Sequence, residues 1–471
     1  METGRYNRQE LIKGWNQSAL EGARVVILGS SQLANFTAAS LVSLGIGNVE
    51  IYDSGKMGEY SPQDGFLLFS AKKGESKAKA LESMLHEMNP ETKVRGVDMR
   101  LEKSPLISIL GKPELIIDLT NSPASKETVL NYAKSRGINV ISASADEART
   151  EMHFITPGEE FERGKLGDYS GKPQGSVESE IMAGILTEET RKILMPLEGE
   201  SPVKKIAYST SAERRFSGEL ETEVKAEDLS GKRVLVVGAG ALGNFVGLGL
   251  ALAGVGNIDL MDFDEIESTN LNRQILFYGA VGRKKAEVLA ERIAAISPQT
   301  KINGIVGKLD ISSDLKQNYD AVIDCVDSFA VRAIINYFAV RNKIPLVSGG
   351  TSPESGQVVV YKPGETACLD CKLGVEKALA KSLASSSCRY APDSSVIMTN
   401  EIIGGIIVGE ARKILAPGYG TPARRIIKYD SKAPTRGGLI GPSEACDCTK
   451  PEAETWIKDL KEKYNGGENG S

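Results

Sequence analysis

Short runs of β-branched and other apolar residues alternate along the chain with longer stretches in which apolar residues recur at helical spacing. In the first part of the chain the short runs predict strands, and the longer stretches predict helices. The strands are expected at 24–28, 49–52, 115–118 and 139–142, and the helices at 76–87 and 125–135. Strands that alternate with helices form βαβ units and a mainly parallel sheet. The pattern therefore predicts an α/β fold with a doubly wound sheet.

This alternation occurs twice in the chain. The run VVILG at residues 25–29 is matched by VLVVG at 234–238, and EIMAGILTEETRKILMP, which begins at Glu180, is matched by EIIGGIIVGEARKILAP, which begins at Glu401. Further matches lie between them in the same order, about 200 residues apart, which indicates a duplicated domain. The separation grows by about 15 residues after Ser348, so the second copy carries an insertion before Glu401.

The repeat divides the chain into three parts. We expect one domain over residues 1–205, a second over 206–448, and a C-terminal helix with a flexible tail over 449–471. One long uncharged stretch, 234–258, has the length of a membrane span. It divides into a short strand, a glycine turn and a helix of small residues, so we reject a span.

The second copy contains a glycine-rich turn between a predicted strand and a predicted helix. Gly238, Gly240 and Gly243 form a G-x-G-x-x-G pattern, in which backbone N–H groups approach a phosphate at a helix N-terminus. Asp262 follows at the end of the next predicted strand, where a carboxylate can hold ribose hydroxyls. Alone, this pattern fits any Rossmann-type nucleotide site, and a dinucleotide-dependent dehydrogenase is the first function to consider.

The residues after this aspartate do not suit a dehydrogenase. The segment DFDEIESTNLNRQ at 262–274 places Asn270 and Arg273 shortly before Lys285, and cations here suit a triphosphate whose charge must be neutralised. Asp327 follows another predicted strand, at the sheet edge where ligands bind, and a carboxylate there suits Mg²⁺. For each residue taken singly, the alternative is a solvated surface charge.

Together these motifs resemble the ubiquitin-activating enzyme superfamily, which includes the adenylyltransferases of molybdopterin and thiamine biosynthesis. The resemblance extends over both copies, from Arg5 to about Cys448. It implies two ThiF-type, Rossmann-like domains related by a pseudo-two-fold axis, with a site for ATP and Mg²⁺ in the second copy. The residues that it implies for this site are Gly238, Gly240, Gly243, Asp262, Asp264, Asn270, Arg273, Gln274 and Lys285 for ATP, and Asp327 for Mg²⁺.

The first copy has lost most of these residues. Its turn, GSSQLA, lacks the second and third glycines, so Cβ atoms obstruct the approach of the backbone to a phosphate. Asp64 stands where the arginine is needed and Asn121 where the Mg²⁺-binding aspartate is needed, although Asp53 and Lys77 remain. The first copy is therefore predicted to keep the fold without the nucleotide chemistry.

The N-terminal segment RYNRQ at residues 5–9 resembles a string with which relatives place an arginine in the ATP site of the opposite domain. The resemblance implies that Arg8 acts like an arginine finger on the phosphates bound by the second copy. The corresponding region of the second copy, 213–216, matches poorly, so only one such arginine is expected. The alternative is an exposed basic tail.

All six cysteines lie in the second copy. Cys368 and Cys371 form a C-x-x-C pair, and Cys446 and Cys448 form a C-x-C pair, which together predict a closed, structural site of four thiolates for Zn²⁺. Relatives carry two C-x-x-C pairs, so the C-x-C pair departs from their pattern. The alternatives are buried apolar cysteines or a redox-active C-x-x-C.

The two remaining cysteines have different predicted roles. Cys325 ends a predicted strand and is expected to pack in the core. Cys388 lies between the C-x-x-C pair and a helix predicted near Thr399, and the resemblance implies that it accepts the activated acyl group. Arg389 next to it would favour the reactive thiolate. The alternative is an incidental cysteine in a loop.

Composition and charge exclude several other functions. Lys and Arg number 57 and Asp and Glu 62, for a net charge of −5, which indicates no basic surface for nucleic acid or an anionic membrane. Two histidines cannot form a three-histidine metal site, and they argue against a Ser-His-Asp triad. No apolar run follows the polar N-terminus as in a secretory signal, so we expect a cytoplasmic protein without a disulfide framework.

The residues and the resemblance lead to one main functional hypothesis. The enzyme uses ATP and Mg²⁺ to adenylate the C-terminal carboxylate of a ubiquitin-like protein that ends in Gly-Gly. Arg8, Arg273 and Lys285 are its catalytic cations, and a thioester then forms on Cys388. It acts as a single-chain pseudo-dimer, with a ubiquitin-conjugating enzyme as a further candidate partner. We expect neither a separate catalytic-cysteine domain between Cys388 and Thr399 nor a ubiquitin-fold domain after Cys448, because few residues are present at either place.

Three alternatives stay open at this point. The first is an adenylyltransferase for a sulfur-carrier protein of the ThiS/MoaD type, which stops at the acyl adenylate or uses Cys388 in sulfur transfer. The second is a non-enzymatic ATP-binding scaffold, and the third is a dehydrogenase. The fusion of an inactive and an active copy favours ubiquitin-like activation, because sulfur-carrier enzymes usually work as dimers of identical active copies.

Overall fold

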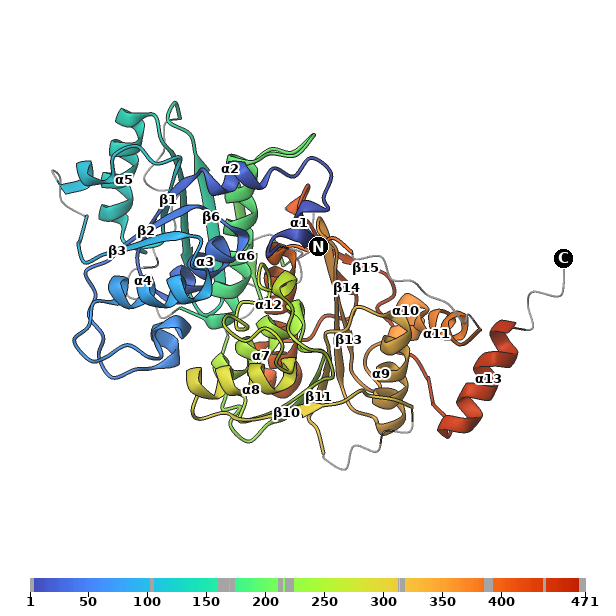
Figure 1. The fold of residues 1–471 in the computed structure, drawn as a ribbon. Coiled ribbons are helices and arrows are strands. Elements are labelled where there is room, and N and C mark those ends of the chain that lie inside the picture. Colours follow the sequence, from blue (N-terminus) through green and yellow to red (C-terminus); the bar gives the residue numbers. More distant parts are fainter. Residues whose placement is uncertain are drawn as a thin grey trace.

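The structure is a computed structural model of the chain. The residues that it describes are 4–101, 106–159, 169, 174–210, 215–216, 224–311, 313, 318–384, 393–434 and 438–465. They form two halves, each built on one central sheet with helices packed against it (Figure 1).

The sheet of the first half follows the strand order β3-β2-β1-β4-β5-β6-β7. Its strands are β1 (Arg24–Leu28), β2 (Asn48–Tyr52), β3 (Lys93–Val97), β4 (Leu115–Asp118), β5 (Asn139–Ala145), β6 (Arg149–Ile155) and β7 (Lys205–Ser209). The pairs from β3 to β5 are parallel, whereas β6 and β7 are antiparallel.

The sheet of the second half repeats this order as β10-β9-β8-β11-β12-β13-β14-β15. Its strands are β8 (Arg233–Val237), β9 (Asn257–Asp262), β10 (Lys301–Val306), β11 (Ala321–Asp324), β12 (Leu346–Thr351), β13 (Ser355–Tyr361), β14 (Ile426–Asp430) and β15 (Leu439–Ile440). The five strands from β10 to β12 are parallel, and the last three are antiparallel.

The helices also correspond between the two halves. Those of the first half are α1 (Asn7–Glu10), α2 (Gln17–Glu21), α3 (Gln32–Leu44), α4 (Lys77–Met88), α5 (Pro123–Arg136) and α6 (Ser176–Leu194). Those of the second half are α7 (Ala241–Leu252), α8 (Lys285–Ile296), α9 (Phe329–Asn342), α10 (Leu369–Leu373), α11 (Val375–Ala384), α12 (Ile397–Leu415) and α13 (Ala453–Asn465). Helices α10 and α11 lie in the predicted insertion.

The predicted fold class is confirmed, with one addition. The predicted strands are β1, β2, β4 and β5, and the predicted helices are α4 and α5. The alternation of apolar runs and helices does not predict the antiparallel strands β6, β7 and β13 to β15. Strand β6 mixes charged and apolar side chains, and only short connections join β5 to β6 and β12 to β13. Such hairpins extend an otherwise parallel sheet at its edge.

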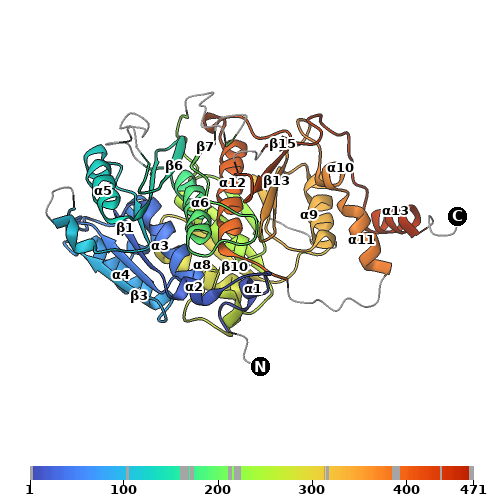
Figure 2. The ribbon, with the colours of Figure 1, turned by 90° about the horizontal axis from the view of Figure 1, so that it is seen from above.

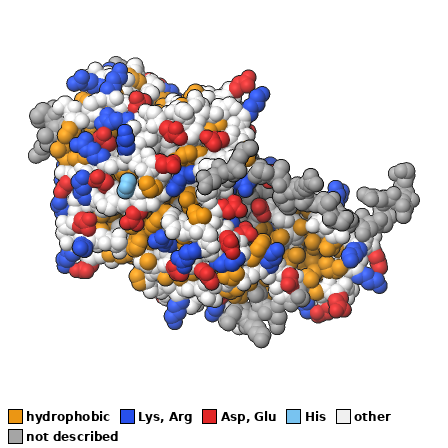
Figure 3. Space-filling model, viewed as in Figure 1, with side chains coloured by type: hydrophobic (Ala, Val, Ile, Leu, Met, Phe, Trp, Pro, Cys, Tyr) orange, Lys and Arg blue, Asp and Glu red, His pale blue; other side chains and the backbone are white. Residues whose placement is uncertain are grey.

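On the face shown in Figure 3, Lys and Arg side chains are interspersed with Asp and Glu side chains. None of the described helices combines the length and the hydropathy that crossing a membrane requires. The uncharged stretch 234–258 divides, as predicted, into β8, a turn, α7 and the start of β9.

Helices α6 and α12 lie side by side at the centre of the molecule, one from each half (Figure 2). They are the two copies of the repeated segment that begins at Glu180 and Glu401. Glycines let them approach closely, since a Cβ at Gly184 would lie 2.6 Å from Cγ1 of Ile402 and one at Gly405 would lie 2.5 Å from Cγ1 of Ile181. The repeated segment therefore forms the largest contact between helices of the two halves.

The first glutamates of these segments are buried where the halves meet. The side chains of Glu180 and Glu401 are fully buried, and Glu401 Oε2 accepts a hydrogen bond of 2.7 Å from the hydroxyl of Ser40 on α3. Both carboxyl oxygens of Glu180 have no hydrogen-bond partner among the described residues. Gly249 on α7 and Gly404 on α12 lie against these oxygens.

Burial raises the pKa of both carboxyl groups well above the ordinary value, and the second carboxyl group raises that of Glu180 further. Because the pKa is raised in the folded state, these two carboxyl groups contribute most to stability below pH 4.5, their ordinary pKa in an unfolded chain. This stability is lost as the pH rises toward the folded-state pKa, because only the unfolded chain releases the protons.

Replacing Glu180 with glutamine is therefore expected to flatten the alkaline loss of stability. The variant should melt close to the wild type at pH 5 and about 3 °C or more above it at pH 8. Thermal melts across this pH range test the expectation, with the exposed α8 residue Glu287→Gln as the matched control. Parallel pH profiles for Glu180→Gln and the wild type would contradict it.

Candidate functional site

The candidate site lies at the carboxyl ends of β8, β9 and β11, which are neighbours in the second sheet. The chain leaves β8 toward β9 on one side, and β11 pairs with β8 on the other side. Ligands of open α/β sheets bind at such a switch point, outside the carboxyl ends of the strands. The glycine turn follows β8, Asp262 is the last residue of β9, and Asp327 follows β11. The topology therefore brings these sequence-predicted residues to one edge of the sheet.

The turn after β8 requires its glycines for steric reasons. Gly238 has a φ of +97°, and a Cβ on it would lie 2.8 Å from the carbonyl oxygen of Cys325. A Cβ on Gly243 would lie 2.0 Å from the carbonyl oxygen of Gly238. By contrast, a Cβ on Gly240 would meet only Nε2 of Gln274, at 4.0 Å. This side of the turn is open, so a phosphate can reach the first N–H groups of α7.

Two carboxylates follow β9 beside this turn. Asp262 Oδ2 accepts a hydrogen bond of 2.7 Å from the Ala239 N–H, and its Oδ1 accepts one of 2.8 Å from the Asp264 N–H. Asp264 in turn forms an ion pair of 3.0 Å with the Lys285 ammonium. Lys285 is buried at the start of α8. The ammonium group is thereby held near the glycine turn.

The segment after β9 orders the remaining predicted phosphate ligands. Asn270 is buried in a 3₁₀ turn, Ser268–Asn270, where its Oδ1 accepts a hydrogen bond of 2.9 Å from the Glu267 N–H. Asn270 therefore has a structural role of its own. Gln274 is buried, and its Oε1 has no hydrogen-bond partner within the part of the chain that the structure describes. An unpartnered amide oxygen beside the glycine turn leaves room for a ligand donor.

Arg273 is a buried cation whose hydrogen bonds go to neutral acceptors. Its Nη1 donates to the carbonyl oxygen of Thr269 at 2.6 Å and to Oδ1 of Asn272 at 2.8 Å. Burial first and the positive charge of Arg8 second lower the pKa of Arg273 to about 10, although the Glu267 carboxylate acts in the opposite direction. A buried guanidinium with a second cation nearby needs an anion to balance it. The pair fits the phosphates of ATP.

Arg8 reaches this place from the other half. It lies on α1, which the first half supplies, and its Nη1 donates to the carbonyl oxygen of Asp393 at 3.3 Å. Its backbone oxygen accepts a hydrogen bond of 3.1 Å from the Ser395 N–H. The next residue, Gln9, is hydrogen-bonded at 2.9 Å to Asn272, which precedes Arg273, and the charge of Arg8 acts on Arg273, so the two arginines share one region. This placement is compatible with an arginine finger, and that role of Arg8 stays a prediction.

The carboxylates after β11 divide into a structural one and an exposed one. Asp324 is fully buried and accepts hydrogen bonds from Arg332 Nη1 at 3.1 Å and from the Ser348 hydroxyl at 2.6 Å. Asp327 is exposed three residues later, and its charge contributes to a raised pKa of Asp324, whose main cause is burial. An exposed carboxylate at this edge fits Mg²⁺, which prefers oxygen ligands and keeps several waters.

In the first half, protein groups fill the corresponding positions. The Leu33 N–H at the start of α3 donates to Oε1 of Gln174 at 3.2 Å, and Gln32 Oε1 accepts a hydrogen bond from the Phe66 N–H. The first turn of this helix therefore faces side chains in place of an open phosphate site. Lys77 forms an ion pair of 3.1 Å with Asp64, the residue found where the second copy has arginine. These contacts explain in physical terms why the first half keeps the fold but has no open phosphate site at this turn.

The four cysteines of the C-x-x-C and C-x-C motifs lie together in the second half. The sulfur atoms of Cys368, Cys371, Cys446 and Cys448 all lie within 4.8 Å of one another. The Cys371 and Cys448 sulfurs are 3.3 Å apart, and the Cys368 N–H donates to the Cys446 sulfur at 3.1 Å. Sulfurs at about 2.3 Å from a tetrahedral Zn²⁺ are separated by slightly less than 4 Å, so the cluster fits that ion. The C-x-C pair completes the set despite its departure from relatives.

Loss of this metal is expected to release the C-terminal helix. Helix α13 follows the C-x-C pair, and its Trp456 is 4% exposed and stacks on Tyr337 of α9 at 4.4 Å. In Cys371→Ser, zinc content should fall from about one ion per chain to near zero, and Trp456 should move toward water. Zinc analysis and fluorescence measure both, with Trp15→Phe as background so that Trp456 is the single reporter.

Two results would contradict this prediction. A wild-type chain that contains no zinc and has four freely titratable thiols at these positions would contradict the metal site. Unchanged Trp456 emission after metal removal would contradict the coupling to α13.

The predictions for the other two cysteines differ in how far the structure bears on them. Cys325 is buried in the core, as the sequence predicts, and burial raises the pKa of its thiol. Cys388, the predicted acyl acceptor, lies outside the described residues, so its role stays a prediction. Among the described residues nearest to it in sequence, Asp393 is the one that accepts the hydrogen bond from Arg8.

Two contacts between the halves have no clear signal in the sequence. Gln9 and Asn272 are hydrogen-bonded between the halves at 2.9 Å, although they are far apart in the chain. The string RYNRQ marks the segment that contains Gln9, but it does not show which residue of the second copy Gln9 meets. The glutamates Glu180 and Glu401 begin the repeated segments, and the repeat alone does not show that they face each other.

Comparison with known proteins identifies the fold and the relatives. The sequence model of the ThiF family matches residues 6–190 and 213–449, which include both halves. The molybdopterin-synthase adenylyltransferase of Escherichia coli is 37% identical over 214 residues, which are 44% of this chain and 81% of the relative. SUMO-activating enzyme subunit 2 of Dictyostelium discoideum is 32% identical over 168 residues, 35% of this chain and 25% of the relative.

Another relative and one solved structure complete the comparison. The adenylyltransferase and sulfurtransferase UBA4 of Yarrowia lipolytica is 38% identical over 146 residues, 31% of this chain and 37% of the relative. A crystal structure of Escherichia coli MccB with ATP has 25% identity over 47% of this chain and 67% of that chain, with a TM-score of 0.39. Each of these alignments covers less than half of this chain.

Proposed function

The chain belongs to the ThiF family, and on this premise we propose that it activates the C-terminal carboxylate of a ubiquitin-like protein. It first uses ATP and Mg²⁺ to form an acyl adenylate in the second half. It then transfers the acyl group to Cys388 as a thioester. The names of its relatives support the first step, because two of them are adenylyltransferases and a third is a SUMO-activating subunit.

One observation supports this proposal above the others. Two guanidiniums, Arg273 from the second half and Arg8 from the first, share a region beside the open glycine turn. The hydrogen bonds of Arg273 go to neutral oxygens, so its charge is available to an anionic ligand. A dehydrogenase cofactor has no triphosphate that needs several cations. The site is therefore suited to ATP and a reaction at its phosphates.

The adenylation step needs no histidine base, because a C-terminal carboxylate is already ionised at neutral pH. A carboxylate oxygen attacks the α-phosphorus, the bond from that phosphorus to the bridging oxygen breaks, and pyrophosphate leaves with the electron pair. Arg8, Arg273 and Lys285 stabilise the charge that develops on the phosphates. When bound, Mg²⁺ supplies further charge neutralisation, and Asp327 is the residue that would hold it.

The thioester step depends on Cys388. Its thiolate sulfur attacks the carbonyl carbon of the acyl adenylate, the bond from that carbon to the phosphate oxygen breaks, and AMP leaves. The proposed partner ends in Gly-Gly, because a C-terminus without side chains hinders the attack on its carbonyl carbon least. In this proposal the enzyme works in the cytoplasm, where thiols stay reduced, and delivers the thioester to a conjugating enzyme.

A second candidate function has its own support. Two of the relatives carry the names of a molybdopterin-synthase adenylyltransferase and of an adenylyltransferase and sulfurtransferase. These names favour a sulfur-carrier protein as the partner, with activation that ends at the adenylate. The same cation site performs this chemistry, so the two candidates differ in the partner and in the role of Cys388.

The experiment that tests the proposal measures ATP–pyrophosphate exchange with purified candidate partners. Exchange should require Mg²⁺ and a ubiquitin-like protein with an intact Gly-Gly terminus, and it should disappear with the same protein lacking these two residues. Exchange that occurs with a ThiS/MoaD-type carrier alone would favour the second candidate. Nicotinamide binding without exchange would contradict both candidates.

A further inference from the structure

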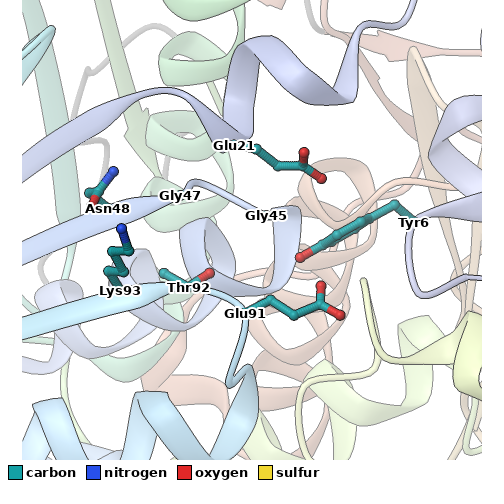
Figure 4. A pocket seen from close by; sticks show the side chains of 8 residues that line it. All are labelled: Tyr6, Glu21, Gly45, Gly47, Asn48, Glu91, Thr92 and Lys93. Carbon is teal, nitrogen blue, oxygen red and sulfur yellow. The ribbon is translucent and has the colours of Figure 1, made fainter.

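The N-terminal segment is anchored on the first half by its aromatic residue. The Tyr6 hydroxyl accepts a hydrogen bond of 2.8 Å from Nδ2 of Asn89, and the ring lines a pocket of about 270 Å³. Figure 4 shows the ring of Tyr6 directed toward Gly45, with Glu21 and Glu91 on either side of it. This anchor fixes where the next residues of the segment, including Arg8 and Gln9, leave the first half.

From this anchor the segment contacts the strand-to-helix connection of the second half. Arg5 joins both halves, because its guanidinium donates to the carbonyl oxygens of Met88 at 3.1 Å and Leu271 at 3.2 Å. The neighbouring residue of that connection, Asn272, donates from Nδ2 to Oε1 of Gln9 at 2.9 Å. The segment therefore meets the residues immediately before Arg273.

Gln9 has a fixed orientation at this contact. Its Nε2 donates to Oε1 of Gln17 at 2.7 Å and to the carbonyl oxygen of Leu44 at 2.9 Å, both in the first half. With both donors used, the acceptor Oε1 faces Asn272. Asn272 uses its amide nitrogen on Gln9, so its Oδ1 is left to accept the hydrogen bond of 2.8 Å from Arg273.

The chain of hydrogen bonds is sealed from water. Gln9 and Asn272 are both fully buried, and Arg273 is 7% exposed. In such surroundings a hydrogen bond to a charged group is strong, and losing one partner leaves a polar group unsatisfied. The orientation of the Arg273 guanidinium is therefore set in part by residues of the other half.

We infer that Gln9 is a positioning residue, which holds the Arg273 guanidinium in place for the phosphates of ATP through Asn272. The inference rests on the proposed function, since it assumes that Arg273 binds these phosphates. It gives the inactive half a second task, because that half supplies Arg8 directly and aligns Arg273 indirectly. The first half has Gln63 and Asp64 at the positions that match Asn272 and Arg273. The relay, by which we mean the hydrogen bonds from Gln9 through Asn272 to Arg273, therefore acts from the first half on the second half and has no counterpart in the opposite direction.

Replacing Gln9 with methionine, which has a similar shape and no amide, should weaken ATP binding about tenfold. Calorimetry with ATP and Mg²⁺ measures this without knowledge of the protein partner. The matched control is Ser40→Ala, which removes another buried hydrogen bond between the halves, the one to Glu401, and should leave the ATP affinity unchanged. If Gln9→Met does not fold in thermal melts, Gln9→Asn keeps the amide but is too short to make all its hydrogen bonds.

A double-mutant cycle separates the relay from a general loss of stability. Arg273→Lys removes the guanidinium group that donates to Asn272. In this background the additional replacement Gln9→Met should lower the ATP affinity by less than twofold. Equal tenfold losses in both backgrounds would contradict the relay. A wild-type chain that binds no ATP would contradict the proposed function itself, whereas wild-type binding that is unchanged in Gln9→Met overturns this inference alone.

Discussion

Replacing Arg8 with alanine is expected to lower the rate of ATP–pyrophosphate exchange by a factor of about 10³, the range known for arginine fingers. The reason is the position of its guanidinium, which α1 of the inactive half brings to the same region as Arg273. Its hydrogen bond to the carbonyl oxygen of Asp393 is 3.3 Å long, so it loses little by turning to a phosphate. Folding should change little, because Arg8 is only half-buried.

The measurement compares initial exchange rates at saturating ATP for the wild type, Arg8→Ala and a control. Lys13→Ala is the matched control, because Lys13 is an exposed cation a few residues later in the same segment. If the N-terminal segment acts only through its positive charge, Arg8→Ala and Lys13→Ala should lower the exchange rate equally. Exchange that is unchanged in Arg8→Ala would refute the arginine finger and leave the fold and the family membership intact.

Much of the fold was predictable because its signals are local and repeated. Apolar runs such as 234–238 are buried strands on any parallel sheet, and the duplication doubles the support for each element. The glycines of the turn were predictable for a similar reason. Gly238 and Gly243 are required by contacts with their own backbone and with the strand beside them, and those contacts follow from the turn itself.

Contacts between the halves were not predictable to the same degree. Gln9 meets Asn272 because the two halves pack through α6 and α12, and nothing near either residue in the sequence encodes that packing. The same holds for Glu180 and Glu401, each of which begins a helix segment of ordinary appearance. Burial of a charged side chain is decided by tertiary packing, and composition gives no warning of it.

The zinc cluster lies between these two cases. The spacing of Cys368 and Cys371 predicts one pair of ligands, and the second pair was identified by residue type alone. Its convergence on the first pair depends on β14 and β15, which carry the chain back to α10, and on the docking of α13. A C-x-C pair suffices there because the return of the chain, and not the spacing, places Cys446 beside the Cys368 N–H.

The proposed division of labour between the halves would have a physical basis in these contacts. An arginine finger and a positioning glutamine are useful only in the half that faces a competent phosphate site. Once Asp64 pairs with Lys77 in the first half, a reciprocal finger from the second half has no substrate to act on. The fused chain can therefore let the region 213–216 diverge while it keeps 5–9.

Replacing Cys388 with alanine is expected to abolish the covalent adduct with the ubiquitin-like protein and to leave ATP–pyrophosphate exchange within about twofold of the wild type. Adenylation uses cations and the partner's own carboxylate, so it does not need the thiol. The adduct is measured on gels with and without a reducing thiol, which cleaves a thioester. In Cys388→Ser, an ester that resists the thiol should accumulate, because oxygen replaces sulfur as the acyl acceptor.

The two candidate functions separate on the same gel. A thiol-sensitive adduct that is present in the wild type and absent from Cys388→Ala supports a two-step activating enzyme. An adduct that persists in the variant would move the acceptor to another residue, and Cys325 is too deeply buried to be one. Exchange without any adduct in the wild type would show that the reaction ends at the adenylate. That outcome would make a sulfur-carrier protein the substrate class that the cation site serves.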